Sequence, residues 1–217
     1  MFKNRNDAGQ KLALKIKEEE NLNFSNTIIV SLPRGGTVIG AALAALLDLP
    51  HYPLVIRKIS LKLNPELAIG AIGQTPDSLF LNKKLINELG ADQEEVNTAI
   101  KAAQKEIKEI QERTKFTQLP DLKNKEVIIT DDGAATGATL LSALRQVKKL
   151  RARKTIIALP VAPADTVSFL KKETDRVIVL LQPKMFFSVS EFYQDFPQVS
   201  WDEVGNLLKL QEGLPRR

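Results

Sequence analysis

The 217-residue chain contains no cysteine and a single histidine, His51. The absence of cysteine excludes disulfide bonds and thiolate-ligated metal sites, and it is compatible with a reducing compartment. With one histidine, a His-rich metal site and a Ser-His-Asp triad built on a second histidine are excluded as well. Because His51 follows Pro50, we expect it to lie in a surface loop.

Long apolar runs are also missing. No stretch approaches the length of a membrane span, and the first twenty residues are charged throughout, without the basic, apolar and small-residue order of a signal peptide. We therefore expect a cytoplasmic protein without a membrane partner. The net charge of +5 suits an anionic ligand. No basic cluster is interleaved with aromatic residues, so nucleic acid is not the expected partner.

The remaining composition is that of a globular protein. Hydrophobic residues make up 43% of the chain and charged residues 26%, which argues against disorder. The sequence shows no internal repeat, low-complexity tract or interdomain linker. We therefore expect residues 1–217 to form a single domain.

Short apolar β-branched runs alternate with segments of helical periodicity along the chain. The runs that predict strands are residues 27–32, 54–59, 126–131, 155–161 and 176–181. The segments that predict helices are residues 7–20, 38–47, 92–114, 138–149 and 163–171, and a last helix begins at about residue 202. This alternation predicts an α/β fold in which a parallel sheet is flanked by helices on both faces.

Residues 61–120 are too long for a simple crossover between two strands. Asn64-Pro65 and the two glycines that follow favour turns and short extended pieces. Further along, Asp92 with Glu95 predicts a capping box at the start of a long amphipathic helix. We expect this segment to be a helical insertion folded onto the core.

The most informative segment is residues 131–139, which follow a predicted strand at the edge of the sheet where ligands bind. Asp131 and Asp132 end the strand, small residues follow, and Thr136-Gly137-Ala138-Thr139 opens a helix. Small residues and free N–H groups at a helix start favour the close approach of a phosphate. Two carboxylates suit the vicinal hydroxyls of a sugar or a magnesium shell, so a ribose 5-phosphate satisfies both halves of the loop. The alternative is an ordinary strand-to-helix turn with two solvated acids.

The sequence from Val127 to Gly137 resembles the 5-phosphoribosyl-1-pyrophosphate (PRPP) binding motif of the type I phosphoribosyltransferases. The sequence Leu32-Pro33-Arg34-Gly35-Gly36 resembles the pyrophosphate loop of the same family, which often holds a non-proline cis peptide bond. By that resemblance, the bond between Pro33 and Arg34 is the expected cis peptide. A simple Pro-Gly turn is the alternative for this loop. Neither the G-x-G-x-x-G nor the G-x-x-x-x-G-K-[ST] nucleotide-binding pattern occurs.

The resemblance implies a role for the residues of these loops. Asp131 and Asp132 are the expected catalytic residues, which hold the ribose hydroxyls and Mg²⁺, directly or through water. The residues expected to cradle the 5-phosphate are Gly133, Ala134, Ala135, Thr136, Gly137, Ala138 and Thr139. The residues expected to bind pyrophosphate are Arg34 and Gly35, with Arg57 and Lys58 at the end of the second predicted strand. A solvated strand end is the alternative for the last two.

A narrower resemblance, to a group of bacterial predicted phosphoribosyltransferases, covers most of the chain. It rests on residues 32–36, Arg57-Lys58, residues 64–71 and the PRPP loop. It supports the fold and PRPP rather than a named product. Ala135 stands where the enzymes of hypoxanthine and guanine usually carry an acid, which argues against 6-oxopurines and leaves other bases open.

In this family a variable hood normally holds the base, and residues 182–201 are the candidate. Phe186 and Phe187 are the candidate base-binding residues, because aromatic rings can stack on a nucleobase. A small satellite core made by the aromatic residues of the hood is the alternative. Trp201 is expected to pack the final helix.

By resemblance, we expect a Mg²⁺-dependent transferase that moves ribose 5-phosphate from PRPP to a nitrogen nucleophile, a nucleobase, and releases pyrophosphate. A homodimer and a mobile flap around Lys62, Asn64 and Glu66 are further expectations of the same kind. The alternative is a regulatory protein of the same fold that senses PRPP or a nucleotide without turnover. An aspartyl-phosphate hydrolase is disfavoured, because adjacent acids point to opposite faces of a strand.

Overall fold

The computed structural model describes residues 1–18, 22–75, 78–115 and 119–212. The centre of the molecule, which we call the body, is a five-stranded sheet in the order β2-β1-β6-β7-β8, and its neighbouring strands are all parallel. These strands are β1 (Thr27–Ser31), β2 (His51–Pro53), β6 (Glu126–Thr130), β7 (Lys154–Val161) and β8 (Arg176–Leu181). The predicted α/β fold with a parallel sheet is therefore confirmed.

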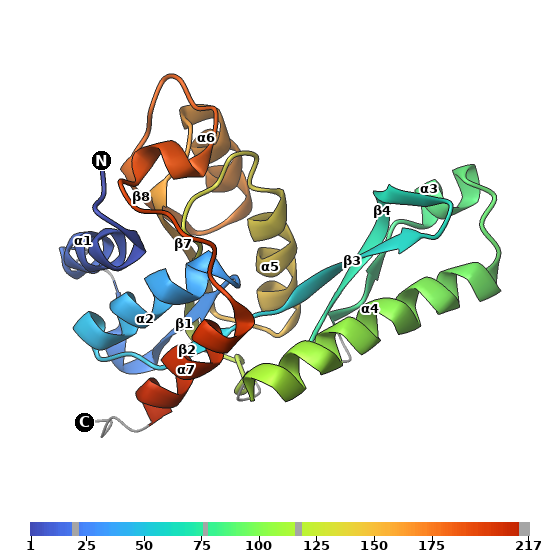
Figure 1. The fold of residues 1–217 in the computed structure, drawn as a ribbon, viewed down its shortest axis with the longest axis horizontal. Coiled ribbons are helices and arrows are strands. Elements are labelled where there is room, and N and C mark those ends of the chain that lie inside the picture. Colours follow the sequence, from blue (N-terminus) through green and yellow to red (C-terminus); the bar gives the residue numbers. More distant parts are fainter. Residues whose placement is uncertain (19–21, 76–77, 116–118, 213–217) are drawn as a thin grey trace.

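Helices cover both faces of this sheet (Figure 1). They are α1 (Arg5–Lys17), α2 (Gly35–Leu47), α5 (Ala138–Lys149) and α6 (Ala164–Glu173). Successive side chains of a strand point to opposite faces, so Ile29 packs with α1 and α2, whereas Ile28 and Val30 pack with α5 and α6. Both faces are buried, which explains why these strands are continuous apolar runs in the sequence.

The second predicted strand, residues 54–59, is confirmed only over residues 56–59, and its place in the parallel sheet is wrong. The parallel sheet ends with β2, and the chain then passes through buried Leu54 and Val55 into β3 (Ile56–Leu61), which belongs to a separate antiparallel sheet. One apolar run covers both the connection and the strand, so its pattern could not divide them. The expected surface loop at His51 is wrong as well. This histidine lies partly buried in β2, with its Nε2 2.7 Å from Ser31 Oγ.

Residues 56–75 and 78–115 form an arm that projects from the body (Figure 1). Its elements are β3, β4 (Asn64–Gly73), β5 (Phe80–Leu81), α3 (Lys83–Glu88) and α4 (Gln93–Thr114). The three strands are antiparallel, and the apolar face of α4 packs on them. Because the arm buries this face against its own sheet, it extends outwards. The prediction that the insertion folds onto the core is therefore wrong.

Within the arm, one local prediction holds and another fails. The capping box between Asp92 and Glu95 is confirmed at the start of α4. Residues 64–73 were predicted to form turns and short pieces, but they form a strand of ten residues. Pro65 is tolerated there because it stands at the second position of the strand, close to the hairpin turn.

The base of the arm is joined to the body by α7 (Trp201–Glu212). Arg113, near the end of α4, donates two hydrogen bonds of 2.9 Å to the carboxylate of Asp202. Val199 and Val204 pack into the apolar core of the arm. In the part of the chain that the structure describes, no helix is both long and apolar enough to cross a membrane.

Candidate functional site

The candidate site lies where β1 and β6 end side by side. Their registers pair Ser31 with Thr130. The chain continues from β1 to β2 on one side of this pair, and from β6 to β7 on the other side. Such a reversal of strand order opens a crevice at the carboxyl edge of a parallel sheet, which is the usual ligand site of this class. The two loops singled out in the sequence flank this crevice.

Asp131 touches the other loop directly. Its Oδ1 accepts the backbone N–H of Asp132 at 2.9 Å, and its carboxylate also accepts the N–H of Gly36. A Cβ placed on Gly36 would lie 2.7 Å from Asp131 Oδ1 and 2.8 Å from its Cα, so only glycine allows this approach. Burial raises the pKa of Asp131 well above its usual value, and the neighbouring Asp132 carboxylate raises it further.

Asp132 is held by an arginine from the first helix. Arg5 Nε lies 2.8 Å from Asp132 Oδ2, and the two side chains are only 9% and 16% exposed. Burial raises the pKa of Asp132, and the hydrogen bond and charge of Arg5 oppose that rise. A Cβ on Gly35 would overlap the Asp132 carboxylate, so the second glycine of the pair is also required.

The segment that follows the acids bends into α5. Gly137 adopts φ = +75° at the N-cap, a left-handed conformation that favours glycine. Ala134 is buried, and its N–H donates to Val161 O at 3.0 Å. The loop residues that remain exposed at the helix start are Ala135, Thr136, Ala138 and Thr139. The start of α5 lies beside the two acids. Its exposed residues carry backbone N–H groups and threonine hydroxyls.

The peptide bond between Pro33 and Arg34 is cis, which confirms the expectation for that loop. A cavity of about 310 Å³ lies beside it. The cavity is lined by Leu32, Pro33, Arg34, Leu54, Val55, Ile56, Arg57, Thr139 and Trp201. The structure therefore brings Arg34, Arg57 and Thr139 together, although they come from three separate stretches of the chain.

Arg57 and Lys58 do not end a strand as predicted, because both lie inside β3. Arg57 lines the cavity and forms an ion pair with Glu106 of α4, with 3.0 Å between Nε and Oε2. Lys58 points to the opposite face of β3, is exposed and does not line the cavity. Of the expected flap residues, Lys62 and Asn64 are exposed near the β3–β4 turn, whereas Glu66 lies in β4.

Most aromatic residues of the hood pack on the core of the body and do not form a separate satellite core. Phe186 stacks on Phe192 with ring centroids 5.5 Å apart, and both pack against the core of the body. Tyr193 is buried and donates its hydroxyl hydrogen to the backbone oxygen of Asp132. Phe187 is 82% exposed. Of the two candidate base-binding rings, one is therefore engaged in packing and the other is open to a ligand.

Sequence reasoning missed two residues of the site. Trp201 was expected only to pack the final helix, but it also lines the cavity. Arg5 was not singled out at all. Its signal was present, because Arg5 stands three and four residues before Ala8 and Gly9, on the buried face of α1. A charged residue in line with a buried face is a candidate for a buried partner.

The two acids are the residues that could hold a cation. The described residues contain no cluster of three or more His, Asp or Glu side chains that could bind a metal by themselves. Mg²⁺ is commonly held by one or two carboxylates together with phosphates of the substrate. Two adjacent carboxylates whose pKa values are raised by burial fit this pattern, since a cation would offset the cost of their ionisation.

Comparison with known proteins agrees with this arrangement. Residues 2–197 match the model of the phosphoribosyl transferase domain. The chain belongs to this family. It is 33% identical over 208 residues to the Mycobacterium tuberculosis protein named "Putative phosphoribosyl transferase Rv0571c", in strain H37Rv, and equally so to its counterpart MT0597 in strain CDC 1551. These matches cover 94% of this chain but 45% of the relatives, so the phosphoribosyl transferase chain spans about half of their length.

A solved structure has the same fold. The crystal structure of the protein TT1426 from Thermus thermophilus superposes on this phosphoribosyl transferase chain with a TM-score of 0.81 and 30% sequence identity. The match covers 95% of this chain and 97% of that one. Because it covers nearly the whole of both chains, the similarity includes the arm as well as the body.

Proposed function

We propose that this domain is a Mg²⁺-dependent phosphoribosyltransferase, which moves ribose 5-phosphate from PRPP to a nitrogen nucleophile, a nucleobase, and releases pyrophosphate. The observation that carries the proposal is the contact between two loops at the crevice. Asp131 and Asp132 lie directly against Gly35 and Gly36, and the start of α5 lies beside them. The crevice therefore offers two acids for a sugar diol and a helix start for one phosphate, and the cavity beside the cis peptide offers two arginines for a second phosphate.

In this proposal the 5-phosphate binds at residues 133–139. The hydroxyls of Thr136 and Thr139 and the exposed N–H groups at the start of α5 contact it, whereas Ala134 holds the loop in place through Val161. Asp131 and Asp132 hold the ribose hydroxyls. Anchoring the sugar at both ends uses binding energy remote from C1′ to keep the reacting ring in position.

The bond between C1′ and the pyrophosphate oxygen then loosens, and positive charge develops on the sugar ring. Arg34 and Arg57, which line the cavity beside the cis peptide, stabilise the leaving pyrophosphate. Asp131 and Asp132 would hold Mg²⁺, which would supply positive charge to the phosphates. Lys58 would reach pyrophosphate only if the arm closed, which is the flap movement that we propose for the turn near Lys62 and Asn64.

The acceptor enters from the side of the hood. Phe187 is the exposed ring that would stack on a base, whereas Phe186 is stacked on Phe192. Ala135 leaves no acid in the phosphate loop, which supports a base other than hypoxanthine or guanine. We further propose that residues 1–217 act as one domain in a cytoplasmic homodimer, and light scattering on the purified protein checks the oligomeric state.

The proposal is tested by measuring pyrophosphate release from PRPP and Mg²⁺ while a panel of nucleobases is offered one at a time. We expect release with at least one base and none with the Asp131→Asn/Asp132→Asn variant. If PRPP binds but no base supports release, the domain is a PRPP-sensing protein without turnover.

A further inference from the structure

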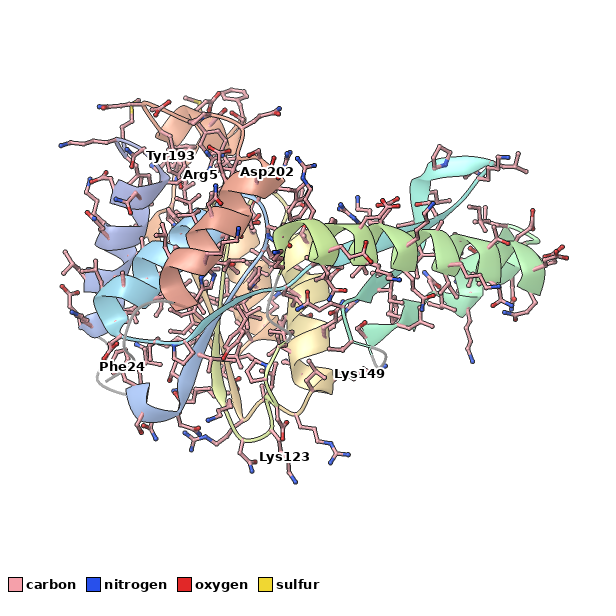
Figure 2. The ribbon with its side chains drawn as sticks, turned by 60° about the horizontal axis from the view of Figure 1, so that its bottom comes forward. Arg5, Phe24, Lys123, Lys149, Tyr193 and Asp202 are labelled. Carbon is pink, nitrogen blue, oxygen red and sulfur yellow. The ribbon has the colours of Figure 1, made fainter. Side chains whose placement is uncertain are left out.

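Arg5 occupies an unusual position for a charged residue. It is the first residue of α1, yet it is only 8% exposed, and it reaches the carboxyl edge of the sheet. The N-cap Asn4 accepts the N–H of Asp7 at 3.0 Å, which fixes the first turn of the helix behind it. Figure 2 shows Arg5 and Tyr193 close together between α1 and the C-terminal segment.

The guanidinium of Arg5 contacts three parts of the site at once. Nε donates to Asp132 Oδ2 at 2.8 Å, and Nη1 donates to the backbone oxygen of Pro197 at 2.7 Å. Its Cζ lies 3.6 Å from the centroid of the Phe196 ring. A Cβ on Gly35 would lie 2.7 Å from Arg5 Nε, so the pyrophosphate loop also packs against it.

The backbone that precedes Arg5 is bonded to the same hood. The N–H of Phe2 donates to Phe192 O at 2.8 Å, and the N–H of Gln194 donates back to Phe2 O at 2.8 Å. The N–H of Asp195 donates to Lys3 O at 3.0 Å. The start of the chain and the hood therefore form one unit, which Arg5 connects to the carboxylate of Asp132 and Tyr193 connects to the backbone oxygen of the same residue.

This geometry divides the oxygens of Asp132. Arg5 occupies one of the acceptor sites of Oδ2, so Oδ1 is the oxygen that Arg5 leaves unshared for a sugar hydroxyl or a cation. The same planar group fixes residues 196 and 197 of the hood by a second hydrogen bond and by stacking, which a lysine could not reproduce. Nothing else among the described contacts joins the acid pair to the hood through a charged side chain.

We propose that Arg5 is a positioning residue of the transfer reaction: it presents Asp132 to the ribose and aligns the acceptor hood over it. The proposal rests on the proposed function, and it names the structural link between the PRPP half and the acceptor half of the site. Arg5 touches the groups that bind the substrates rather than the reacting atoms.

Two measurements test the two parts of this role separately, namely the presentation of Asp132 and the alignment of the hood. The first is the Kd for PRPP in the presence of Mg²⁺, measured by calorimetry. The second is the rate of amide hydrogen exchange in residues 182–200. We expect Arg5→Ala to raise the Kd by roughly 10- to 100-fold, as for the loss of a buried charge-assisted hydrogen bond, and to speed exchange in the hood.

The conservative variant Arg5→Lys decides between a positioning role and simple packing. It keeps a charge opposite Asp132 but loses the donor to Pro197 and the planar contact with Phe196. We expect its Kd for PRPP to stay within about 3-fold of wild type, because the charge remains, while hood exchange is as fast as in Arg5→Ala. Lys11→Ala is the matched control: it removes a cation from the same helix, near Phe2, and should change neither readout.

Each outcome is decisive. If Arg5→Ala binds PRPP as tightly as wild type, or if Arg5→Lys fails as badly as Arg5→Ala, the positioning of Asp132 by charge is wrong. If Arg5→Ala does not fold, Arg5→Gln, which keeps most of the side-chain volume, takes its place with the same expected Kd. If wild type itself does not bind PRPP, the proposed function is wrong, which is a distinct result from failure of the variants.

Discussion

The acid pair of the body and helix α4 of the arm hold their charged residues in opposite ways. In the body, Arg5 and Asp132 are largely withdrawn from water, and backbone N–H groups fix Asp131. On α4 of the arm, ion pairs such as Lys105–Glu109 and Lys108–Glu112 lie 3.8 and 3.7 Å apart with side chains more than 60% exposed. Buried pairs fix geometry strictly, whereas exposed pairs contribute little to stability. The comparison shows that the charged residues of the acid pair in the body are fixed more strictly than those on α4 of the arm.

Arg57 is where the two regions meet. It belongs to the first strand of the arm, lines the cavity of the body and is paired with Glu106. Substitutions that change the body should therefore alter PRPP binding and stability together. Substitutions in the arm should alter binding by small factors and only through Arg57.

The largest effect is expected for Asp131→Asn in the body. PRPP affinity should fall by roughly 100-fold, since one member of the buried carboxylate pair no longer carries charge. The free energy of unfolding of this variant should instead rise. Because burial and Asp132 raise the folded-state pKa of Asp131 above its unfolded value, ionisation of this carboxyl costs stability as the pH rises through the folded pKa.

Calorimetry with Mg²⁺ and PRPP, together with thermal melts between pH 4 and pH 8, checks this prediction. The variant should melt above wild type at pH 8, and the gap should close towards pH 4. Asp121→Asn, at an exposed acid before β6, is the control and should change neither quantity. A variant that melts below wild type at pH 8 would contradict the sign of the pKa shift.

Two glycine-to-alanine substitutions, one in the body and one in the arm, should differ in their effects on stability and on PRPP affinity. Gly36→Ala places a Cβ 2.7 Å from Asp131 Oδ1, so the two loops of the body must separate. We expect a loss of about 2 kcal/mol in the free energy of unfolding and at least a tenfold loss of PRPP affinity. Gly90→Ala in the arm has φ = +65° but no described atom within 4 Å of its new Cβ, so only backbone strain of about 1 kcal/mol is expected.

Denaturant unfolding and PRPP titration of both variants measure the contrast. Gly90→Ala should bind PRPP like wild type. Equal losses of PRPP affinity in the two variants would show that the arm shapes the site as strongly as the body does.

A smaller effect is expected at the junction. Glu106→Gln removes the anion that pairs with Arg57, which leaves more of the arginine's charge for pyrophosphate. We expect PRPP affinity to rise by about 3-fold, because the pair is partly exposed and therefore weak. Glu109→Gln, on the same helix but paired with Lys105, is the control. A fall in affinity would mean that Glu106 holds Arg57 in its binding orientation.

The smallest effect concerns stability in acid. Burial alone would raise the pKa of Asp175, but hydrogen bonds from the N–H and hydroxyl of Thr155, 2.7 and 2.8 Å long, lower it. The ionised carboxylate of Asp175 therefore stabilises the fold at pH values above its unfolded-state pKa. This stabilisation is lost as the pH falls through its folded-state pKa. Asp175→Asn should cost about 0.5 kcal/mol near pH 7, discounted for exposure, and nothing in strong acid.

Thermal melts of wild type and Asp175→Asn between strong acid and pH 7 measure this difference in stability. The same change at Asp202, which is exposed together with its partner Arg113, should shift the melting temperature less. A shift at Asp175 that persists unchanged in acid would exclude the hydrogen-bonded carboxylate as its cause.

The body could be predicted from the sequence because its strands are buried on both faces and its helices have clear periodicity. The same patterns placed residues 131–139 and the loop at residues 33–36 at the edge of the sheet, whereas the cis peptide of residues 33–34 was expected only from the resemblance to the type I phosphoribosyltransferases. The arm could not be predicted in this way. The apolar run through Leu54 and Val55 hid the break between the two sheets. The periodicity of an insertion also does not show whether its helix packs on the core of the body or on the strands of the insertion itself. Arg5 was missed because its partner Asp132 is 127 residues away.

The most direct test is a calorimetric titration of the wild-type protein with PRPP, first with Mg²⁺ and then with a chelator. We expect saturable one-site binding with Mg²⁺, much weaker binding with the chelator, and none in Asp131→Asn/Asp132→Asn. Absence of PRPP binding by folded wild-type protein in Mg²⁺ would contradict the function proposed for the crevice between β1 and β6.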